Sequence, residues 1–271
     1  VVIGIALRVD DYGSLLLYGD EFHSVELSRA SYSRIFRSFD DPGSGIALPL
    51  LQRIFHDLFG RGLWVYRLPA LVSGLAALVF VYPMARRFVG VPAAAITTLA
   101  LAFSSIHVFY SHFARAYAVA TLAGIGLVYA LERATRPGRG RRGDYALAAL
   151  LAGLLPFLHP TSAVLVAGAA LGAGLRLIGD RRSPRELVRL TGWLLAGGLL
   201  CLFLYLPALE STLFVVSHRA AQGGGDFGVL DVGEVLFGSR AAAIVALTAL
   251  PACWLRMLRM RGAVAWLPVC A

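Results

Sequence analysis

Residues 68–84, LPALVSGLAALVFVYPM, form an uncharged and apolar stretch that begins directly after Arg67 and is followed by Arg86 and Arg87. A helix of this length and polarity suits the hydrocarbon core of a membrane, with arginines at the water boundaries. Similar stretches recur along the chain, which is 58% hydrophobic and 15% charged, with a mean hydropathy of +0.71. The sequence therefore predicts an integral membrane protein built as an all-α, polytopic transmembrane helix bundle.

The other predicted spans are residues 91–108, 116–131, 190–209 and 241–255. Residues 145–178 would extend about 50 Å as one helix, well beyond a bilayer. His159 and Pro160 interrupt this run, so we predict a hairpin of two spans, whose first leg at 145–158 is short enough to leave a partly re-entrant segment open.

The chain is interpreted as a single transmembrane domain, residues 1–271, truncated at both ends. In this interpretation residues 8–62 form an outside loop, residues 63–262 carry transmembrane helices 2–8, and residues 263–271 begin a further helix.

Arginine placement predicts the orientation. All 25 basic residues are arginines, and the net charge is +9. Fifteen of them fall in loops on one side of the predicted spans, whereas the short loops on the other side carry Arg115, Arg219 and Arg240. Because positively charged loops stay on the cytoplasmic side of a membrane, this bias places residues 8–62 outside. It also explains the basic net charge, so a nucleic-acid-binding function is not needed to account for it. Arginine without lysine, together with abundant Ala, Gly and Leu, favours a bacterial plasma membrane.

The first outside loop carries half of the acidic residues of the chain, which indicates a functional segment. These are Asp10, Asp11, Asp20, Glu21, Glu26, Asp40, Asp41 and Asp57. Residues 28–41 and 49–59 are predicted to form short amphipathic helices at the membrane surface. In the second helix the apolar side comprises Leu50, Leu51, Ile54 and Leu58, and the polar side comprises Gln52, Arg53, His56 and Asp57.

Three local patterns are interpreted without a function. Residues 223–228, GGGDFG, match a nucleotide-binding glycine pattern but lack the flanking strand and helix, so a loop is predicted. His23 and Glu26 could share a helix face, yet no metalloprotease pattern surrounds them. The cysteines lie in apolar runs and are predicted to be packing residues. They are Cys201, Cys253 and Cys270.

The order of motifs resembles the membrane glycosyltransferases of the GT-C class, in particular the protein mannosyltransferase and aminoarabinose transferase group, glycosyltransferase family 39 and its bacterial relatives. The resemblance covers about residues 10–175. The motifs are Asp20-Glu21, Leu48-Pro49-Leu50, Leu58-Phe59-Gly60, Tyr66-Arg67-Leu68-Pro69-Ala70-Leu71, the run from Phe109 to Tyr117, and His159. Relatives commonly have His-Pro-Pro-Leu-Tyr where this chain has IALPL at residues 46–50.

The resemblance implies transfer of a sugar from a polyprenyl-phosphate donor to a lipid, glycan or protein hydroxyl on the outer face, with inversion at the anomeric carbon. The acid that matches the family's base is Asp20. Glu21 would orient the acceptor or a cation, and a divalent cation cofactor is left open. The departing phosphate needs a nearby positive charge, for which Arg115 is suited.

The remaining candidate substrate-binding residues are Tyr117, His159, Arg67 and His112. Tyr117 could bond the same phosphate as Arg115, and His159 could contact substrate or metal. Five candidates have a structural alternative: Asp20 and Glu21 as helix-start acids, Arg115 as an anchor at the edge of a span, Arg67 as a cap on its span, and His159 as a turn residue.

Two other functions remain as alternatives at this point: a polytopic transporter or lipid flippase, and a catalytically idle assembly partner. A transporter would place ionisable groups inside its spans, whereas here the carboxylates gather outside. This distribution favours an enzyme. If it is correct, the long loop forms two or three short helices and brings Asp20 close to Arg115.

Overall fold

The computed structural model describes residues 1–214, apart from residues 11, 13–15, 18, 40–44, 61, 139 and 181–182. Within this part the fold is helical, without a strand, so the predicted all-α class is confirmed. The helices are α1 (Val2–Val9), α2 (Glu21–Ser28), α3 (Tyr32–Arg37), α4 (Ala47–Phe59), α5 (Leu63–Phe103), α6 (Ser105–His112), α7 (Tyr117–Ala134), α8 (Arg142–Leu158), α9 (Ser162–Gly179), α10 (Pro184–Tyr205) and the 3-10 turn η1 (Leu206–Ala208). The predicted loop at 223–228, the span at 241–255, the run at 263–271, Cys253 and Cys270 lie outside the described residues.

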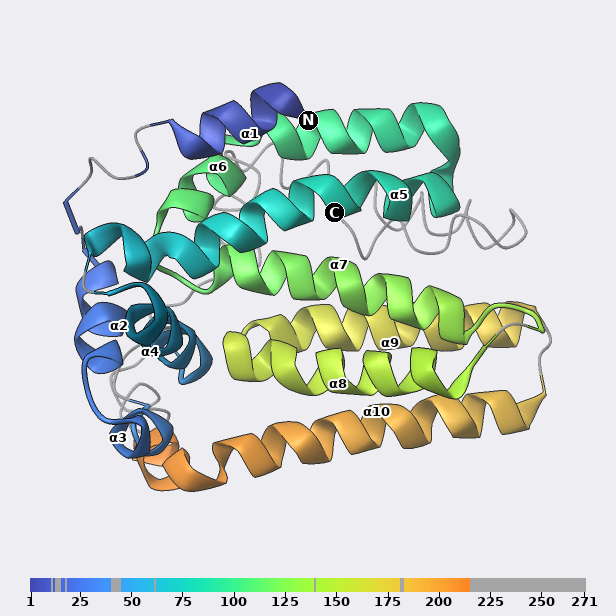
Figure 1. The fold of residues 1–271 in the computed structure, drawn as a ribbon. Coiled ribbons are helices and arrows are strands. Elements are labelled where there is room, and N and C mark those ends of the chain that lie inside the picture. The colour runs from blue at the N-terminus through green and yellow to red at the C-terminus, as the bar shows by residue number, and fades with distance from the viewer. Residues whose placement is uncertain are drawn as a thin grey trace, which may run out of the picture.

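The long helices run side by side, and the three short helices α2, α3 and α4 gather at one end of them (Figure 1). The connections α7–α8 and α9–α10 lie at the opposite end, together with the turn inside α5. The polar loop is therefore separated from the arginine-rich loops by the full length of the bundle. The three short helices agree with the structure predicted for the outside loop.

A turn at Gly90 divides α5 into two antiparallel legs. Gly90 has φ 78° and ψ −179°, a conformation that disfavours any residue with a side chain. The legs correspond to the predicted spans at 68–84 and 91–108, but the second leg ends at Phe103. The prediction of continuous helix to residue 108 is wrong because Ser104 is extended and its hydroxyl accepts from the His107 amide at 3.2 Å, which starts a new helix, α6.

The end of α5 is capped by a buried arginine from α1. Arg8 donates from Nη2 to the Leu101 carbonyl at 2.9 Å and from Nη1 to the Ala102 carbonyl at 3.2 Å. Its Nη2 also donates to Nδ1 of His107 at 2.8 Å. Because the last carbonyls of a helix have no partner within the helix, this side chain satisfies them and joins α1 to the α5–α6 corner.

The predicted break in residues 145–178 is confirmed, since α8 ends at Leu158 and α9 begins at Ser162. Of these two helices α9 has the length and hydropathy of a membrane span, whereas α8, with 17 residues, is shorter, as expected for the first leg. In the described part of the chain, three helical segments have the length and hydropathy of a membrane span: Leu63–Phe103, Ser162–Gly179 and Pro184–Phe214, with mean hydropathies of 1.9, 1.7 and 1.9. The pair α6 and α7, bent by 116°, passes the same test as one broken span. The predicted spans at 116–131 and 190–209 correspond to α7 and to α10 with η1, to within one residue at Ala116 and at Leu209.

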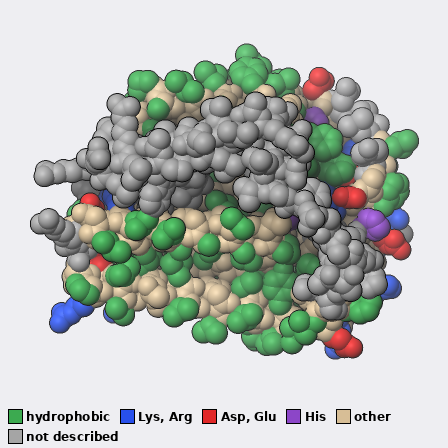
Figure 2. All heavy atoms as spheres, turned by 180° about the vertical axis from the view of Figure 1, so that it is seen from behind, with side chains coloured by type: hydrophobic (Ala, Val, Ile, Leu, Met, Phe, Trp, Pro, Cys, Tyr) green, Lys and Arg blue, Asp and Glu red, His purple; other side chains and the backbone are tan. Residues whose placement is uncertain are grey.

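Small residues allow a close contact between α8 and α10. A Cβ atom at Gly153 would lie 2.5 Å from the Gly197 carbonyl oxygen, and one at Gly197 would overlap the carbonyl oxygen of Ala149. On the outer side of α10, Leu195, Leu199 and Leu202 are exposed. Figure 2 shows hydrophobic side chains spread along the flank of the helices and charged ones toward both ends, as a lipid environment requires.

Candidate active site

The adjacent acids Asp20 and Glu21 occupy opposite environments at the start of α2. The Asp20 side chain is 68% exposed, whereas that of Glu21 is fully buried. Asp20 holds the N-cap position, but its carboxylate makes no capping hydrogen bond with the helix. An acid that caps a helix would use its carboxylate on the backbone, so this carboxylate is available for contacts in front of the helix.

Glu21 forms a buried, bidentate ion pair with Arg67 of α5. Nε of Arg67 donates to Oε1 at 2.8 Å, and Nη2 donates to Oε2 at 2.6 Å. The backbone amide of Ala114 also donates to Oε1, at 2.7 Å. A planar guanidinium matched to a carboxylate in this way fixes position as well as charge. Glu21 thus joins α2 to α5 and to the α6–α7 connection, and both of its oxygens are engaged within the protein.

Arg115 lies beside Asp20 in that α6–α7 connection. Its Nη2 is 3.4 Å from Oδ2 of Asp20, and its Nη1 donates to the Asp20 carbonyl at 3.4 Å. Arg115 is 3% exposed, so a buried guanidinium meets an exposed carboxylate at the water boundary. The sequence expectation that these residues, 95 positions apart, lie close together agrees with this geometry. The 116° bend between α6 and α7 places Arg115 there.

Tyr117 and His159 extend this cluster toward the α8–α9 turn. Their ring centroids are 4.9 Å apart, and Tyr117 is 4.2 Å from the ring of Tyr110. Nδ1 of His159 is 2.6 Å from Oγ1 of Thr161, and its Nε2 is buried without a hydrogen-bond partner. Burial, and secondarily the positive charge of Arg115, lower the pKa of His159 below its usual value. Both effects favour the neutral form of the imidazole.

Tyr110 is a member of this cluster that the sequence analysis did not single out. It interacts electrostatically with Tyr117, Arg115 and Asp20, although it belongs to α6. Tyr110 and Tyr117 are separated by one break between two helices, and only the bend at that break brings their rings into contact. Tyr110 and Tyr117 both belong to the run from Phe109 to Tyr117, and this shared motif could have indicated Tyr110 as a site residue.

The two other candidates have different surroundings. Arg67 is engaged by Glu21 and also donates to the Leu16 carbonyl at 2.8 Å. His112 packs edge-on against Tyr12, with ring centroids 6.4 Å apart, and its Nε2 is buried without a hydrogen-bond partner. Arg67 is thus tied to the residue next to Asp20, and His112 is tied to the ring of Tyr12. Within residues 1–214 as described, no group of three His, Cys, Asp or Glu side chains is arranged to hold a metal ion.

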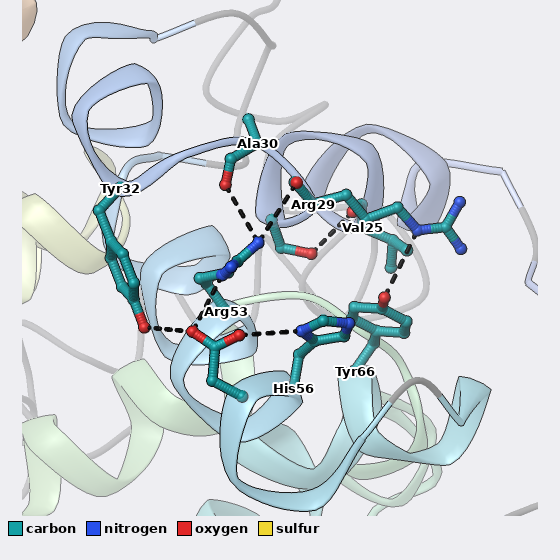
Figure 3. A network of polar contacts seen from close by, with 9 residues as sticks. Val25, Arg29, Ala30, Tyr32, Arg53, His56 and Tyr66 are labelled. Carbon is teal, nitrogen blue, oxygen red and sulfur yellow. Dashed lines mark hydrogen bonds and ion pairs between the residues drawn. The ribbon is translucent and has the colours of Figure 1, made fainter.

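A polar network holds α3 and α4 together (Figure 3). Asp57 accepts from the Tyr32 hydroxyl at 2.7 Å and from Nε of Arg53 at 3.0 Å, and it lies 3.2 Å from Nδ1 of His56. These contacts, led by the Tyr32 hydrogen bond, lower the pKa of Asp57. Arg53 also donates to the Arg29 carbonyl at 3.3 Å, which adds the end of α2 to the network.

The face predicted for α4 requires one correction. Gln52, assigned to the polar, water-facing side, is fully buried; its amide donates to the Tyr66 carbonyl at 3.0 Å and to the Ser24 hydroxyl at 3.4 Å. The helix is covered by α2 and α5 on that side, so the polar residue satisfies buried backbone instead of facing water. On the predicted apolar side Leu58 is 69% exposed.

The apolar residues at positions 46–50 are packing residues. Ile46 and Leu48 are fully buried, and Ile46 packs with Phe157 and Leu158 at the end of α8. Gly45, at φ 61°, passes so close to this end of α8 that a Cβ atom would lie 3.1 Å from the Leu158 carbonyl oxygen. This segment therefore supports the turn that carries His159.

Comparisons with known proteins place this geometry in context. The sequence profile of the family described as dolichyl-phosphate-mannose-protein mannosyltransferase matches residues 42–210, more than half of the chain. No curated protein sequence matches significantly.

Two solved structures share the fold: ArnT from Cupriavidus metallidurans in the apo state, with 18% identity and a TM-score of 0.64, and the same protein bound to undecaprenyl phosphate, with 19% and 0.66. Each alignment covers 99% of this chain and 52% of ArnT, so the chain spans about half the length of that protein.

Proposed function

Because the chain belongs to the dolichyl-phosphate-mannose-protein mannosyltransferase family and has the GT-C fold, we propose that it is the sugar-transferring part of an inverting membrane glycosyltransferase. The proposed donor is a sugar linked to a polyprenyl phosphate, and the proposed acceptor is a hydroxyl of a lipid, a glycan or a protein. The undecaprenyl phosphate bound to a protein of the same fold supports a lipid phosphate as the carrier.

The contact between Asp20 and Arg115 is the observation that carries this proposal. An inverting transfer needs a base for the acceptor and a positive charge for the leaving group, within reach of one substrate. The Asp20 carboxylate is exposed, while the guanidinium 3.4 Å away is buried. A water-borne acceptor can therefore reach the acid, and the adjacent guanidinium is proposed to meet the phosphate of the lipid donor.

The reaction then proceeds as a single displacement. The Asp20 carboxylate takes the proton of the acceptor hydroxyl as its oxygen attacks the anomeric carbon of the sugar. The bond between that carbon and the phosphate oxygen breaks, and the polyprenyl phosphate departs with the electron pair. Arg115 stabilises the negative charge on the departing phosphate. Tyr117 and His159 are proposed to contact the same phosphate, since both lie in one cluster with Arg115.

Glu21 and Arg67 are proposed as positioning residues. Their buried ion pair fixes the start of α2, where Asp20 stands, against the connection that carries Arg115. The proposed location of the site is the outer face of a bacterial plasma membrane, at the end of the bundle that carries α2, α3 and α4. This placement rests on the arginine bias of the opposite loops.

The test is transfer from a radiolabelled polyprenyl-phosphate sugar by membranes that contain the full-length protein. Asp20→Asn removes the base without changing the size of the side chain, so we expect the transfer rate to fall at least about 100-fold at an unchanged protein level. Glu26→Gln is the matched control, because Glu26 is a second exposed acid on α2. Equal transfer by wild type and Asp20→Asn would contradict the assignment of the base.

A further inference from the structure

His159 has two ring nitrogens in different surroundings. The residue closes α8, is 7% exposed, and has its Nδ1 at 2.6 Å from the Thr161 hydroxyl. Nε2 is buried and has no hydrogen-bond partner. A buried polar atom without a partner costs free energy, so a ligand or a water at this position would be favourable.

The Thr161 contact is compatible with two tautomers of a neutral imidazole. If the threonine hydroxyl donates to Nδ1, the ring proton is on Nε2, which is then a donor. If Nδ1 donates to the hydroxyl, Nε2 carries a lone pair and is an acceptor. In the first arrangement His159 suits a ligand that accepts a hydrogen bond, and in the second it suits a ligand that donates one.

The surroundings of His159 select between them. The charged group that acts on the ring is the Arg115 guanidinium from the α6–α7 connection, and Tyr117 from α7 and Thr161 from the α8–α9 turn provide the neighbouring polar side chains. An anion attracted by Arg115 needs further N–H or O–H donors. A lone pair on Nε2 would repel it.

We propose that Thr161 is a positioning residue: its hydroxyl donates to Nδ1 of His159 and keeps the ring proton on Nε2, so that His159 is a neutral hydrogen-bond donor to the phosphate of the lipid-linked sugar. This inference rests on the proposed function for the identity of the phosphate. It gives Thr161 a part in recognising the lipid-linked sugar. His159 then acts as a neutral hydrogen-bond donor and neither as a base nor as a cation.

The tautomer can be measured without any activity. Ring nitrogens with and without a proton have well-separated ¹⁵N chemical shifts, and His159→Gln identifies the His159 signals in the full-length, ¹⁵N-histidine-labelled protein. We expect a proton on Nε2 in the wild type and in Thr161→Ser, and a mixture of tautomers in Thr161→Val. A proton on Nδ1 in the wild type would overturn the inference.

The KM for the polyprenyl-phosphate sugar tests the consequence for substrate binding. Thr161→Val should raise the KM for the polyprenyl-phosphate sugar about threefold to tenfold, the effect of losing one hydrogen bond, while Thr161→Ser should restore it. Gln places an amide N–H near the position of Nε2, and Asn places one near Nδ1. We therefore expect His159→Gln to retain a lower KM than His159→Asn.

A double substitution separates the proposed role from a merely structural one. Since a glutamine at position 159 has no tautomer, Thr161→Val should have no further effect on KM in the His159→Gln background. An equal effect of Thr161→Val in both backgrounds would contradict the inference.

The pH profile adds an independent readout. If His159 is a neutral hydrogen-bond donor, the KM for the polyprenyl-phosphate sugar should not change between about pH 6.5 and pH 8. A cationic His159 would instead bind that sugar more weakly as the pH rises through this range. If Asp20→Asn abolishes transfer while Thr161→Val changes neither the tautomer nor the KM, this inference is contradicted and the proposed function is not. Unchanged transfer in Asp20→Asn would contradict the proposed base, while the ¹⁵N result would stand.

Discussion

At the scale of single residues, burial divides the acid pair into two roles. The exposed carboxylate of Asp20 faces Arg115, and the buried carboxylate of Glu21 holds Arg67 and the Ala114 amide. A sequence shows two adjacent acids but not their solvent exposure. On a helix, consecutive side chains point about 100° apart, which is enough to place one in water and the other in the core.

We expect Glu21→Gln to reduce stability more than it alters the chemistry. The substitution leaves the Arg67 guanidinium buried without its countercharge, and breaking such a pair costs about 3 to 5 kcal/mol. Thermal unfolding of the solubilised full-length protein should show a lowered midpoint. Glu26→Gln is the control on the same helix, and an unchanged midpoint for Glu21→Gln would indicate that the ion pair does not anchor α2.

At the scale of elements, breaks in helices create the site. The α6–α7 bend carries Arg115 and aligns Tyr110 with Tyr117, and the α8–α9 turn carries His159. Ser104 starts α6 by capping it, and Pro160 follows the end of α8. These local signals are visible in the sequence, but the angle that each break imposes depends on packing against neighbouring helices.

The α8–α10 contact gives a prediction at this scale. Gly197→Ala should destabilise the bundle, because the added methyl group meets the Ala149 backbone, which cannot move independently of α8. The expected loss is about 1 to 3 kcal/mol. Gly192→Ala on the same helix is the matched control, since nothing lies within 4 Å of a Cβ atom there and alanine favours helix.

The readout for both glycine variants is the thermal unfolding midpoint in one detergent. A lower midpoint for Gly197→Ala and an unchanged or higher one for Gly192→Ala is expected. Equal midpoints would show that α8 and α10 do not approach as closely as the structure indicates.

At the scale of the whole molecule, the two ends of the bundle differ in chemistry. One end carries α2, α3 and α4 with the candidate site, and the other carries the connections α7–α8 and α9–α10 (Figure 1). Arginine-containing ion pairs recur at that second end, including Arg133 with Asp144 at 2.8 Å and Arg136 with Glu132 at 2.8 Å. The positive-inside rule predicts that this second end faces the cytoplasm.

Thiol labelling of intact cells tests this orientation. In a background without Cys201, Cys253 and Cys270, Ser31→Cys lies before α3 and Ser183→Cys lies before α10, and both positions are exposed. A membrane-impermeant maleimide should modify Ser31→Cys in intact cells and Ser183→Cys only after permeabilisation. The reverse pattern would place the candidate site on the cytoplasmic face.

By itself, the sequence determined the helical class and the hairpin at His159-Pro160, because hydropathy and proline act locally along the chain. The expectation that Asp20 and Arg115 meet came from the resemblance of the motifs to a known family. Only the tertiary structure decided which acid is buried, that Gln52 is inside, that helix ends at Phe103, and that Tyr110 and Thr161 join the cluster. The physical reason is that solvent exposure and hydrogen-bond partners are properties of packed neighbours, and those neighbours are distant in sequence.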